Sequence, residues 1–268
     1  PNAAGTDGPL QTLAAAQRRL REGRDPAYSP PAPAQAGGQA GPVTVWLRGG
    51  VYPLDAPLVF GPEDSAPVTV AAYPGETPVL DGGTRLTGWQ LAEVHGRTAW
   101  VLDLPAVRAG TWHFRSLFVN GRRAARPRLP KQGLFRMAEA PDMGEAQHGW
   151  GPGGETHFVA APGDVRPFAN LTDVEVVYVH FWVEERSTLA AVDPETRLVT
   201  MARPSMMRLV GAHDGELADY YFDNVCEALS EPGEWYLDRA QGRLYYLPLP
   251  GEEPETAAAY SPRLLQLL

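Results

Sequence analysis

Val43-Thr44-Val45-Trp46-Leu47 and Val68-Thr69-Val70-Ala71-Ala72 are two similar apolar segments that begin twenty-five positions apart. A turn containing glycine or proline follows each segment, and a second short apolar run follows each turn, at Val51–Leu54 and then at Thr77–Leu80. Repetition at a period of about 20–50 residues is typical of stacked repeat proteins. Because the repeated unit holds short β-prone runs and no helical pattern, it predicts a parallel β-helix rather than a helical solenoid.

A short helix is expected before the first repeat. Thr6 or Asp7 can cap it, and apolar residues from Leu10 to Leu20 fall at helical spacing. Such a helix would cover the open end of a β-helix. Two coils are too few to bury their own faces, since about three or more repeats are needed. We therefore expect a truncated chain, in which the last apolar run, Tyr260–Leu268, re-enters a β-helix whose later coils lie beyond it.

The repeat is lost from Trp89 onward, where strand-like runs alternate with turn signals such as Asp193–Thr196 and Asp238–Gly242. Antiparallel pairing through short loops predicts a β-sandwich inserted into the β-helix. The expected strands are 99–104, 113–119, 174–183, 189–192, 198–201, 235–237 and 244–247. The predicted fold is all-β, with a capping helix and first coils of a right-handed parallel β-helix over 1–88, an antiparallel β-sandwich over 89–255 and re-entry at 256–268.

Composition limits the functional classes. The 28 glycines and 27 prolines among 268 residues are spread along the chain and indicate many turns. A net charge of −9 argues against nucleic acid or an anionic membrane as partner, and no segment has the length of a membrane span. With Cys226 as its single cysteine, the sequence indicates no disulfide framework, and no histidine spacing or acidic loop suggests a metal or cofactor. The oligomeric state is left open.

The candidate site residues are aromatic and basic. His180 and Trp182 lie two apart on an expected strand and would project from one face, with Arg186 close by. They could contact sugar rings and hydroxyl groups, or His180 and Trp182 could fill the sandwich core. His148 and Trp150 lie in a segment rich in glycine and proline, 131–167, that is expected to be a binding loop or lid and to contact glycan.

Charged clusters give two further hypotheses. The densest basic run consists of Arg122, Arg123, Arg126 and Arg128. It is either a solvated strand edge, or one of its arginines forms an ion pair with a substrate or catalytic carboxylate. The adjacent Glu184-Glu185 pair would point to opposite faces of a strand, so it is not expected to form a catalytic pair.

Several segments resemble carbohydrate-active proteins. The N-terminal cap and first two coils of right-handed parallel β-helix proteins resemble Gly5–Leu13, Trp46–Tyr52 and Pro67–Glu76. The β-sandwich insertion of proteins similar to glycoside hydrolase family 141 resembles Phe118–Arg123, Phe222–Val225 and Glu231–Asp238. The β-xylosidases of family 120 share this general layout.

The resemblance implies an exported bacterial glycoside hydrolase, secreted or periplasmic, that acts on a plant or microbial polysaccharide. In such proteins the catalytic carboxylates lie on later β-helix coils, so no catalytic residue is assigned in this chain, which we expect to be inactive alone. Two alternatives stay open on the same scaffold. One is a non-catalytic glycan-binding or surface-adhesion protein, and the other is a polysaccharide lyase, which would carry Lys, Arg and often calcium-binding aspartates on those coils.

Overall fold

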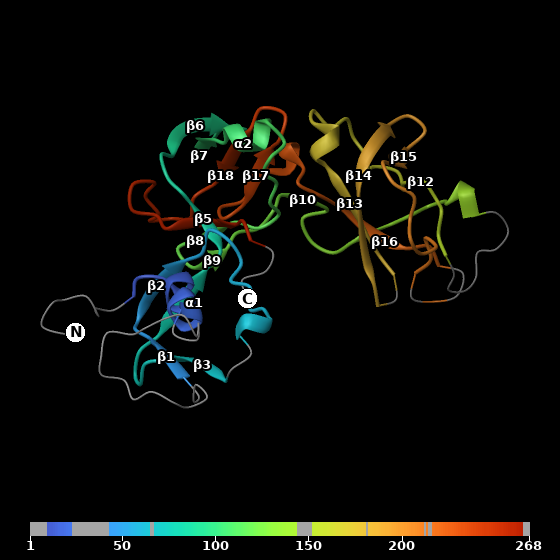
Figure 1. The fold of residues 1–268 in the computed structure, drawn as a ribbon. Helices are drawn as coiled ribbons and strands as arrows, with labels where there is room; N and C mark the ends of the chain where they lie inside the picture. Colours follow the sequence, from blue (N-terminus) through green and yellow to red (C-terminus); the bar gives the residue numbers. More distant parts are fainter. Residues whose placement is uncertain are drawn as a thin grey trace, which may run out of the picture. The chain divides into compact units, whose positions relative to one another are not determined.

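The computed structural model describes residues 10–22, 43–64, 67–143, 152–180, 182–211, 213 and 216–264. The chain forms two compact units, one of residues 1–84 and 262–268 and the other of residues 85–261. Strands dominate both units, as expected for an all-β chain (Figure 1). In the described part of the chain, no helix has the length and apolarity needed to cross a membrane. The predicted assignment of domains stays a prediction.

The smaller unit contains the two sequence repeats. Its strands are β1 (Val43–Leu47), β2 (Gly50–Pro53), β3 (Val68–Ala72) and β4 (Pro78–Asp81). β1 pairs in parallel with β3, with Val43 opposite Val68, and β2 pairs in parallel with β4, with Val51 opposite Val79. The pairing of equivalent segments that the repeat predicts is therefore confirmed. Two small parallel sheets result, and the complete β-helix stays a proposal.

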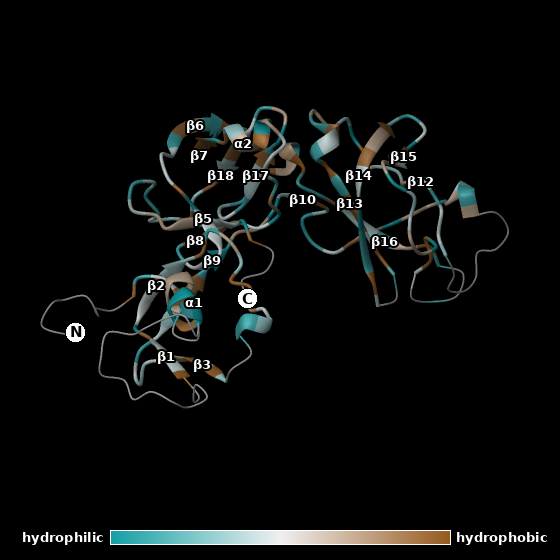
Figure 2. Ribbon diagram, in the orientation of Figure 1, coloured by the Kyte–Doolittle hydropathy of each residue, from teal (hydrophilic) through white to brown (hydrophobic). Residues whose placement is uncertain are grey.

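A helix covers one side of this unit. The helix α1 (Leu13–Glu22) begins later than expected, because the hydroxyl of Thr12 accepts a hydrogen bond from the backbone of Ala15 at 3.1 Å. The predicted caps Thr6 and Asp7 lie outside the described residues. Figure 2 shows that α1 carries both hydrophilic and hydrophobic residues. Its apolar face, with Leu13 and Ala16, packs near Val45 and Val70 of β1 and β3.

The larger unit has two layers of antiparallel sheet around one core and a third sheet around another. The first pair of sheets has the orders β17-β18-β7-β6 and β5-β19-β8-β9. Their bounds are β5 (Gly83–Leu86), β6 (Gln90–Val94), β7 (Arg97–Asp103), β8 (Phe118–Val119), β9 (Arg122–Arg123), β17 (Trp235–Asp238), β18 (Arg243–Tyr246) and β19 (Ala259–Pro262), with the helix α2 (Pro105–Arg108) after β7. Side chains from both sheets share one core, in which Trp100 contacts Tyr246 and Phe114 stacks on Trp235.

The third sheet has the order β10-β16-β13-β14-β15-β12, and β11 also pairs with β16. Its strands are β10 (Arg128–Leu129), β11 (Phe135–Arg136), β12 (His157–Val159), β13 (Glu175–Val179), β14 (Glu184–Asp193), β15 (Leu198–Met201) and β16 (Asp219–Asp223). A shift of register in β14 between Leu189 and Ala191 bends the sheet. Phe158, Tyr220 and Phe222 fill the core beside it. Short 3-10 turns lie at Pro62–Asp64, Pro141–Met143, Leu171–Asp173 and Cys226–Ala228.

Three expectations about the larger unit are corrected. The single strand expected over 174–183 is instead β13 and a reversal that precedes β14, because the backbone of His180 donates to the carbonyl of Val183 at 2.8 Å and turns the chain. The strand expected over 113–119 is shortened to β8. The loop expected over 131–167 is partly regular, because Phe135 and Phe158 bring β11 and β12 onto the core beside the third sheet.

Candidate functional site

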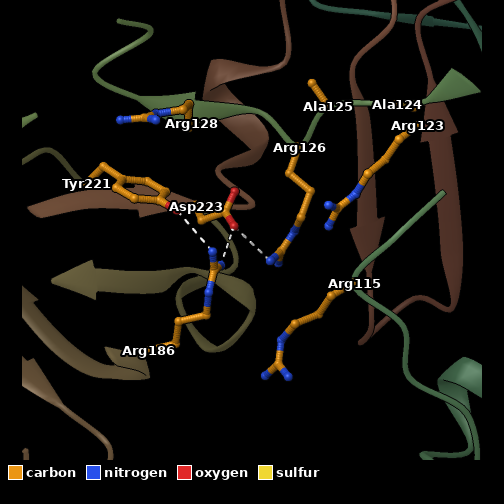
Figure 3. A pocket seen from close by; sticks show the side chains of 9 residues that line it. All are labelled: Arg115, Arg123, Ala124, Ala125, Arg126, Arg128, Arg186, Tyr221 and Asp223. Carbon is orange, nitrogen blue, oxygen red and sulfur yellow. Dashed lines mark hydrogen bonds and ion pairs between the residues drawn. The ribbon is translucent and has the colours of Figure 1, made fainter. Parts of the chain in front are cut away.

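Five arginine side chains line a cavity of about 480 Å³ in the larger unit (Figure 3). Residues 123–128, from β9 to β10, supply most of its wall, while Arg115 before β8 and residues of β14 and β16 supply the rest. The lining residues are Arg115, Arg123, Ala124, Ala125, Arg126, Arg128, Arg186, Tyr221 and Asp223. This volume lies within the range of about 300–1,000 Å³ that is usual for small-molecule pockets.

Two buried carboxylates form the base of the site. Arg126 donates through Nη1 to Glu175 at 2.7 Å and to Asp223 at 2.9 Å, and its side chain is only 10% exposed. Arg115 donates through Nε to the other oxygen of Glu175 at 2.7 Å. Buried charges need such partners, because an unpaired one would retain its full desolvation cost. The ion pairs therefore fix Arg126 in one place.

Arg186 joins the base to the rim of the pocket. Its guanidinium donates through Nη1 to Asp223 at 2.8 Å, through Nη2 to the hydroxyl of Tyr221 at 3.0 Å and through Nε to Glu184 at 2.8 Å. Figure 3 shows Arg126 and Arg186 converging on Asp223 from two directions. Burial would lower the pKa of Arg186, but the hydrogen bond to Asp223 and nearby negative charge raise it above the ordinary value. Arg186 thus stays charged.

The pKa of Glu175 shows that the arginines dominate this environment. Burial alone would raise this pKa, yet the charge of Arg126 and hydrogen bonds from Arg126 and Arg115 lower it to about 2. The nearby imidazole of His113 has a lowered pKa, first through burial and then through the positive charges of Arg239 and Arg115. The lowered pKa of Glu175, and the contribution of the two arginine charges to that of His113, indicate a positive local potential.

Arg123 and Arg128 carry charge that no carboxylate of the described residues neutralises. Arg123 donates to the hydroxyl of Ser116 at 3.2 Å, and Arg128 donates to the carbonyl oxygens of Pro130 at 3.0 Å and Gly133 at 2.5 Å. The guanidinium carbon of Arg128 also lies 3.9 Å from the centre of the Tyr221 ring. Arg126 and Arg128 are therefore built into the fold, whereas Arg123 belongs to an exposed strand, β9.

The structure separates the two predicted residues of the 180–182 turn. His180 is buried, at 3% exposure, while Trp182 is 71% exposed. The shared strand face expected for them is wrong, because β13 ends at Val179 and both residues precede β14, which begins at Glu184. His180 lies 3.1 Å from a carboxylate oxygen of Glu185 and packs edge-on against Tyr178, so it belongs to the core. The interpretation that placed both residues in the core is therefore right for His180 and wrong for Trp182.

The other predictions give mixed outcomes. Of the candidate residues, Arg186 lines the pocket. His148 and Trp150 lie outside the described residues. Glu184 and Glu185 point to opposite sides of β14 as expected, since Glu184 contacts Arg186 at the surface and Glu185 contacts the buried His180.

The buried carboxylate of Glu175 is not suited to proton donation. A general acid in glycoside hydrolysis requires a raised pKa, whereas that of Glu175 is lowered to about 2. Burial raises the pKa of Asp164, but this residue does not line the pocket. Its carboxylate accepts a hydrogen bond from the hydroxyl of Tyr220 at 3.0 Å. In the part of the chain that the structure describes, no group of three or more His, Cys, Asp or Glu is placed to hold a metal ion.

One feature of the sequence partly indicates this pocket, the basic run 122–128. It does not identify Arg115, which precedes the run, or Glu175 and Asp223, which come from distant segments. Glu175 is a charged residue at the start of an apolar strand, EVVYV, and that contrast was a usable signal of a buried ion pair.

Comparison with known proteins gives two matches. Residues 97–249 match the sequence profile of a family described as "GH141 insertion domain". A solved structure titled "Glycoside hydrolase" is similar over 96% of this chain, with a TM-score of 0.69 and 24% sequence identity. The aligned region is 43% of that structure's chain, so this chain spans less than half the length of its structural neighbour. No curated protein sequence matches this chain.

Proposed function

This chain belongs to the GH141 insertion domain family, and on that premise we propose that it is part of an exported glycoside hydrolase in which the arginine pocket contacts a polysaccharide. The pocket is the observation that carries the proposal. It offers a cavity of about 480 Å³ lined by guanidinium groups and the hydroxyl of Tyr221. Such donors suit the many oxygen atoms of a sugar.

We also propose that the smaller unit begins a right-handed parallel β-helix. The parallel pairs β1-β3 and β2-β4 support this, because their partners are one repeat apart in the sequence. The catalytic carboxylates would then lie on later coils, in keeping with the lowered pKa of Glu175. The role proposed for this chain is to bind and position the glycan.

Exposed side chains extend the proposed contact surface. Trp182 presents an indole ring, 71% exposed, that could stack on a sugar ring. Arg186 already lines the pocket, and His148 and Trp150 remain proposed contacts in the 131–167 segment. His180 is buried, so it would not contact the glycan directly. Its proposed role is to support the turn that carries Trp182.

A cavity-filling substitution tests the proposed function. Ala125 is exposed and lines the pocket, so Ala125→Trp would occupy space there without changing charge. We expect it to abolish binding of the full chain to the polysaccharides that the unmodified chain retains in affinity electrophoresis. Ala92→Trp, on the exposed edge strand β6, is the matched control and should bind normally.

Trp182→Ala tests the indole in the same assay, with Trp46→Ala as an exposed tryptophan control from the smaller unit. The proposal fails if no polysaccharide binds the full chain, or if Ala125→Trp and Ala92→Trp bind equally. If Ala125→Trp loses binding and its circular dichroism spectrum also shows that it is unfolded, the smaller substitution Ala125→Leu replaces it in the test of the pocket.

A non-catalytic glycan-binding protein is the second candidate. The ion pairs that hold Glu175 and Asp223 favour it, because neither carboxylate of the pocket is available for acid or base chemistry. Reducing ends released from a bound polysaccharide by the whole protein would support hydrolysis, whereas binding without product would support this alternative.

A further inference from the structure

We propose that the arginine pocket recognises an oxyanion carried by the glycan, the carboxylate of an acidic sugar or a sulfate ester, so that its ligand is an acidic rather than a neutral glycan. The inference rests on the proposed function, because it assigns a ligand class to the same site. Arginine binds a carboxylate and a sulfate in the same way, through paired N–H donors, so the same pocket would suit an acidic sugar and a sulfated sugar.

The charge balance of the pocket favours an anionic ligand. Five guanidinium groups line it, whereas three carboxylates contact them, those of Glu175, Asp223 and Glu184. Two positive charges are therefore in excess within a chain whose net charge is −9. Self-repulsion among fixed cations disfavours the empty pocket, and an anionic ligand would relieve it.

The cations held at the base of the pocket are pre-organised. Arg126 is fixed by Glu175 and Asp223 through one nitrogen, Nη1, and its Nε is buried without a hydrogen-bond partner among the described residues. Arg186 is fixed by Asp223, Tyr221 and Glu184. Because these side chains are already ordered, a ligand would not have to immobilise them, which favours binding.

Other N–H donors of the pocket stay available to a ligand. Arg115 contacts Glu175 through Nε, so its two terminal nitrogens have no carboxylate partner among the described residues. Arg123 bonds only a hydroxyl there, that of Ser116. In Figure 3 these two side chains lie on the same side of the pocket as Arg126. A carboxylate or sulfate in the cavity would meet donors from more than one of them.

A structural role alone does not account for the whole cluster. Arg126 and Arg186 are sufficient to pair the two buried carboxylates. Arg115 is a further partner of Glu175, at 2.7 Å, beyond those two. Arg123 and Arg128 contact no carboxylate among the described residues, so pairing of buried charge does not explain their presence.

Calorimetric titration of the full chain tests the proposal with three probes of similar size. These are digalacturonic acid, its neutral methyl ester and a galactose disaccharide that carries a sulfate ester. We expect binding of the acid, of the sulfate or of both, weakened by added NaCl, and at least about tenfold weaker binding of the methyl ester. Preference for the acid or for the sulfate identifies the source of the oxyanion.

Two arginine variants provide a matched comparison. Arg115 and Arg136 are each 52% exposed and each donate through Nε to a carboxylate at 2.7 Å, but only Arg115 lines the pocket. We expect Arg115→Gln to weaken binding of the charged probe about tenfold or more and Arg136→Gln to leave it within about twofold. Arg123→Gln should act like Arg115→Gln, and because Arg123 contacts no buried carboxylate it keeps the test valid if Arg115→Gln fails to fold.

The outcomes separate this inference from the proposed function. Equal affinity for the acid and its methyl ester would overturn acidic recognition, as would equal effects of Arg115→Gln and Arg136→Gln. Binding of neutral polysaccharides that Ala125→Trp abolishes would then still support a glycan pocket. Failure of every charged and neutral glycan to bind would overturn both proposals.

Discussion

At the scale of single residues, the buried ion pairs make stability depend on pH. The pKa of Glu175 is lowered from an ordinary value of 4.5 to about 2. A lowered pKa means that the folded state favours the carboxylate, so its contribution is complete above pH 4.5 and is lost as the pH falls toward 2. At about 1.4 kcal/mol for each pH unit between the two pKa values, this contribution is about 3 kcal/mol.

We therefore expect Glu175→Gln to lower the free energy of urea unfolding by about 3 kcal/mol at pH 7, and the difference from the unmodified chain to shrink between pH 4.5 and 2. Glu184→Gln is the control, since this carboxylate also contacts Arg186 but is exposed. If Glu175→Gln lowers the free energy of unfolding by the same amount at pH 4.5 and at pH 2, the ionised carboxylate of Glu175 does not stabilise the fold through its ion pairs.

The arginine pocket illustrates what the sequence could not show at this scale. The run 122–128 identified Arg126, but its partners Glu175 and Asp223 are 49 and 97 residues away. Local patterning does not encode such pairs, because they depend on how β13 and β16 meet. Likewise, the two-residue spacing of His180 and Trp182 predicted a shared face, and a reversal without glycine or proline broke it.

At the scale of elements, one asparagine directs the chain out of β16. Asn224 is buried with a φ of +57°, in the left-handed region that costs most side chains about 1–2 kcal/mol. Its Nδ2 donates to the carbonyl oxygens of Asp173 at 3.0 Å and Leu237 at 3.4 Å. The side chain thus connects the end of β16 with two other segments of the larger unit.

Two substitutions separate the backbone and hydrogen-bond contributions of Asn224. Asn224→Ala should destabilise the chain by about 3 kcal/mol, because it leaves buried carbonyl groups unpaired and retains a strained φ. Asn224→Gly should cost about 1 kcal/mol less, since glycine accepts a positive φ freely. Denaturant midpoints measure both, and equal midpoints for the two variants would show that backbone strain is unimportant there.

Element prediction succeeded where the pattern was local. The apolar repeat placed β1 opposite β3 with the correct partners, and 198–201 coincides with β15. It failed for β11 and β12, which are two and three residues long. These strands form because Phe135 and Phe158 reach a core assembled from distant strands, so tertiary packing outweighs a glycine- and proline-rich local sequence.

At the scale of the whole molecule, the two units differ in how much apolar surface they cover. The larger unit encloses aromatic cores around Trp100, Trp235 and Tyr220. The smaller unit has only two-stranded sheets among its described residues, and Val51, Val79 and Trp46 on them are exposed. A two-stranded sheet is marginally stable by itself, and exposed apolar residues of this kind are open to an apolar dye.

We expect a protein made of residues 85–261 to unfold cooperatively and to leave the fluorescence of anilinonaphthalene sulfonate low, whereas the full chain should raise it. The reason is that eight of the twelve exposed large apolar side chains among the described residues belong to the smaller unit. In the full chain, the double substitution Val51→Thr and Val79→Thr should reduce the fluorescence of the dye. The same change at Val94 and Val101 of the larger unit is the control.

Two outcomes would contradict this assignment: a full chain that does not raise the fluorescence of the dye, or an 85–261 protein that raises it as much as the full chain does. Either outcome would also weaken the proposal that β1–β4 form the beginning of a longer stack, because that proposal requires a face that further coils would cover.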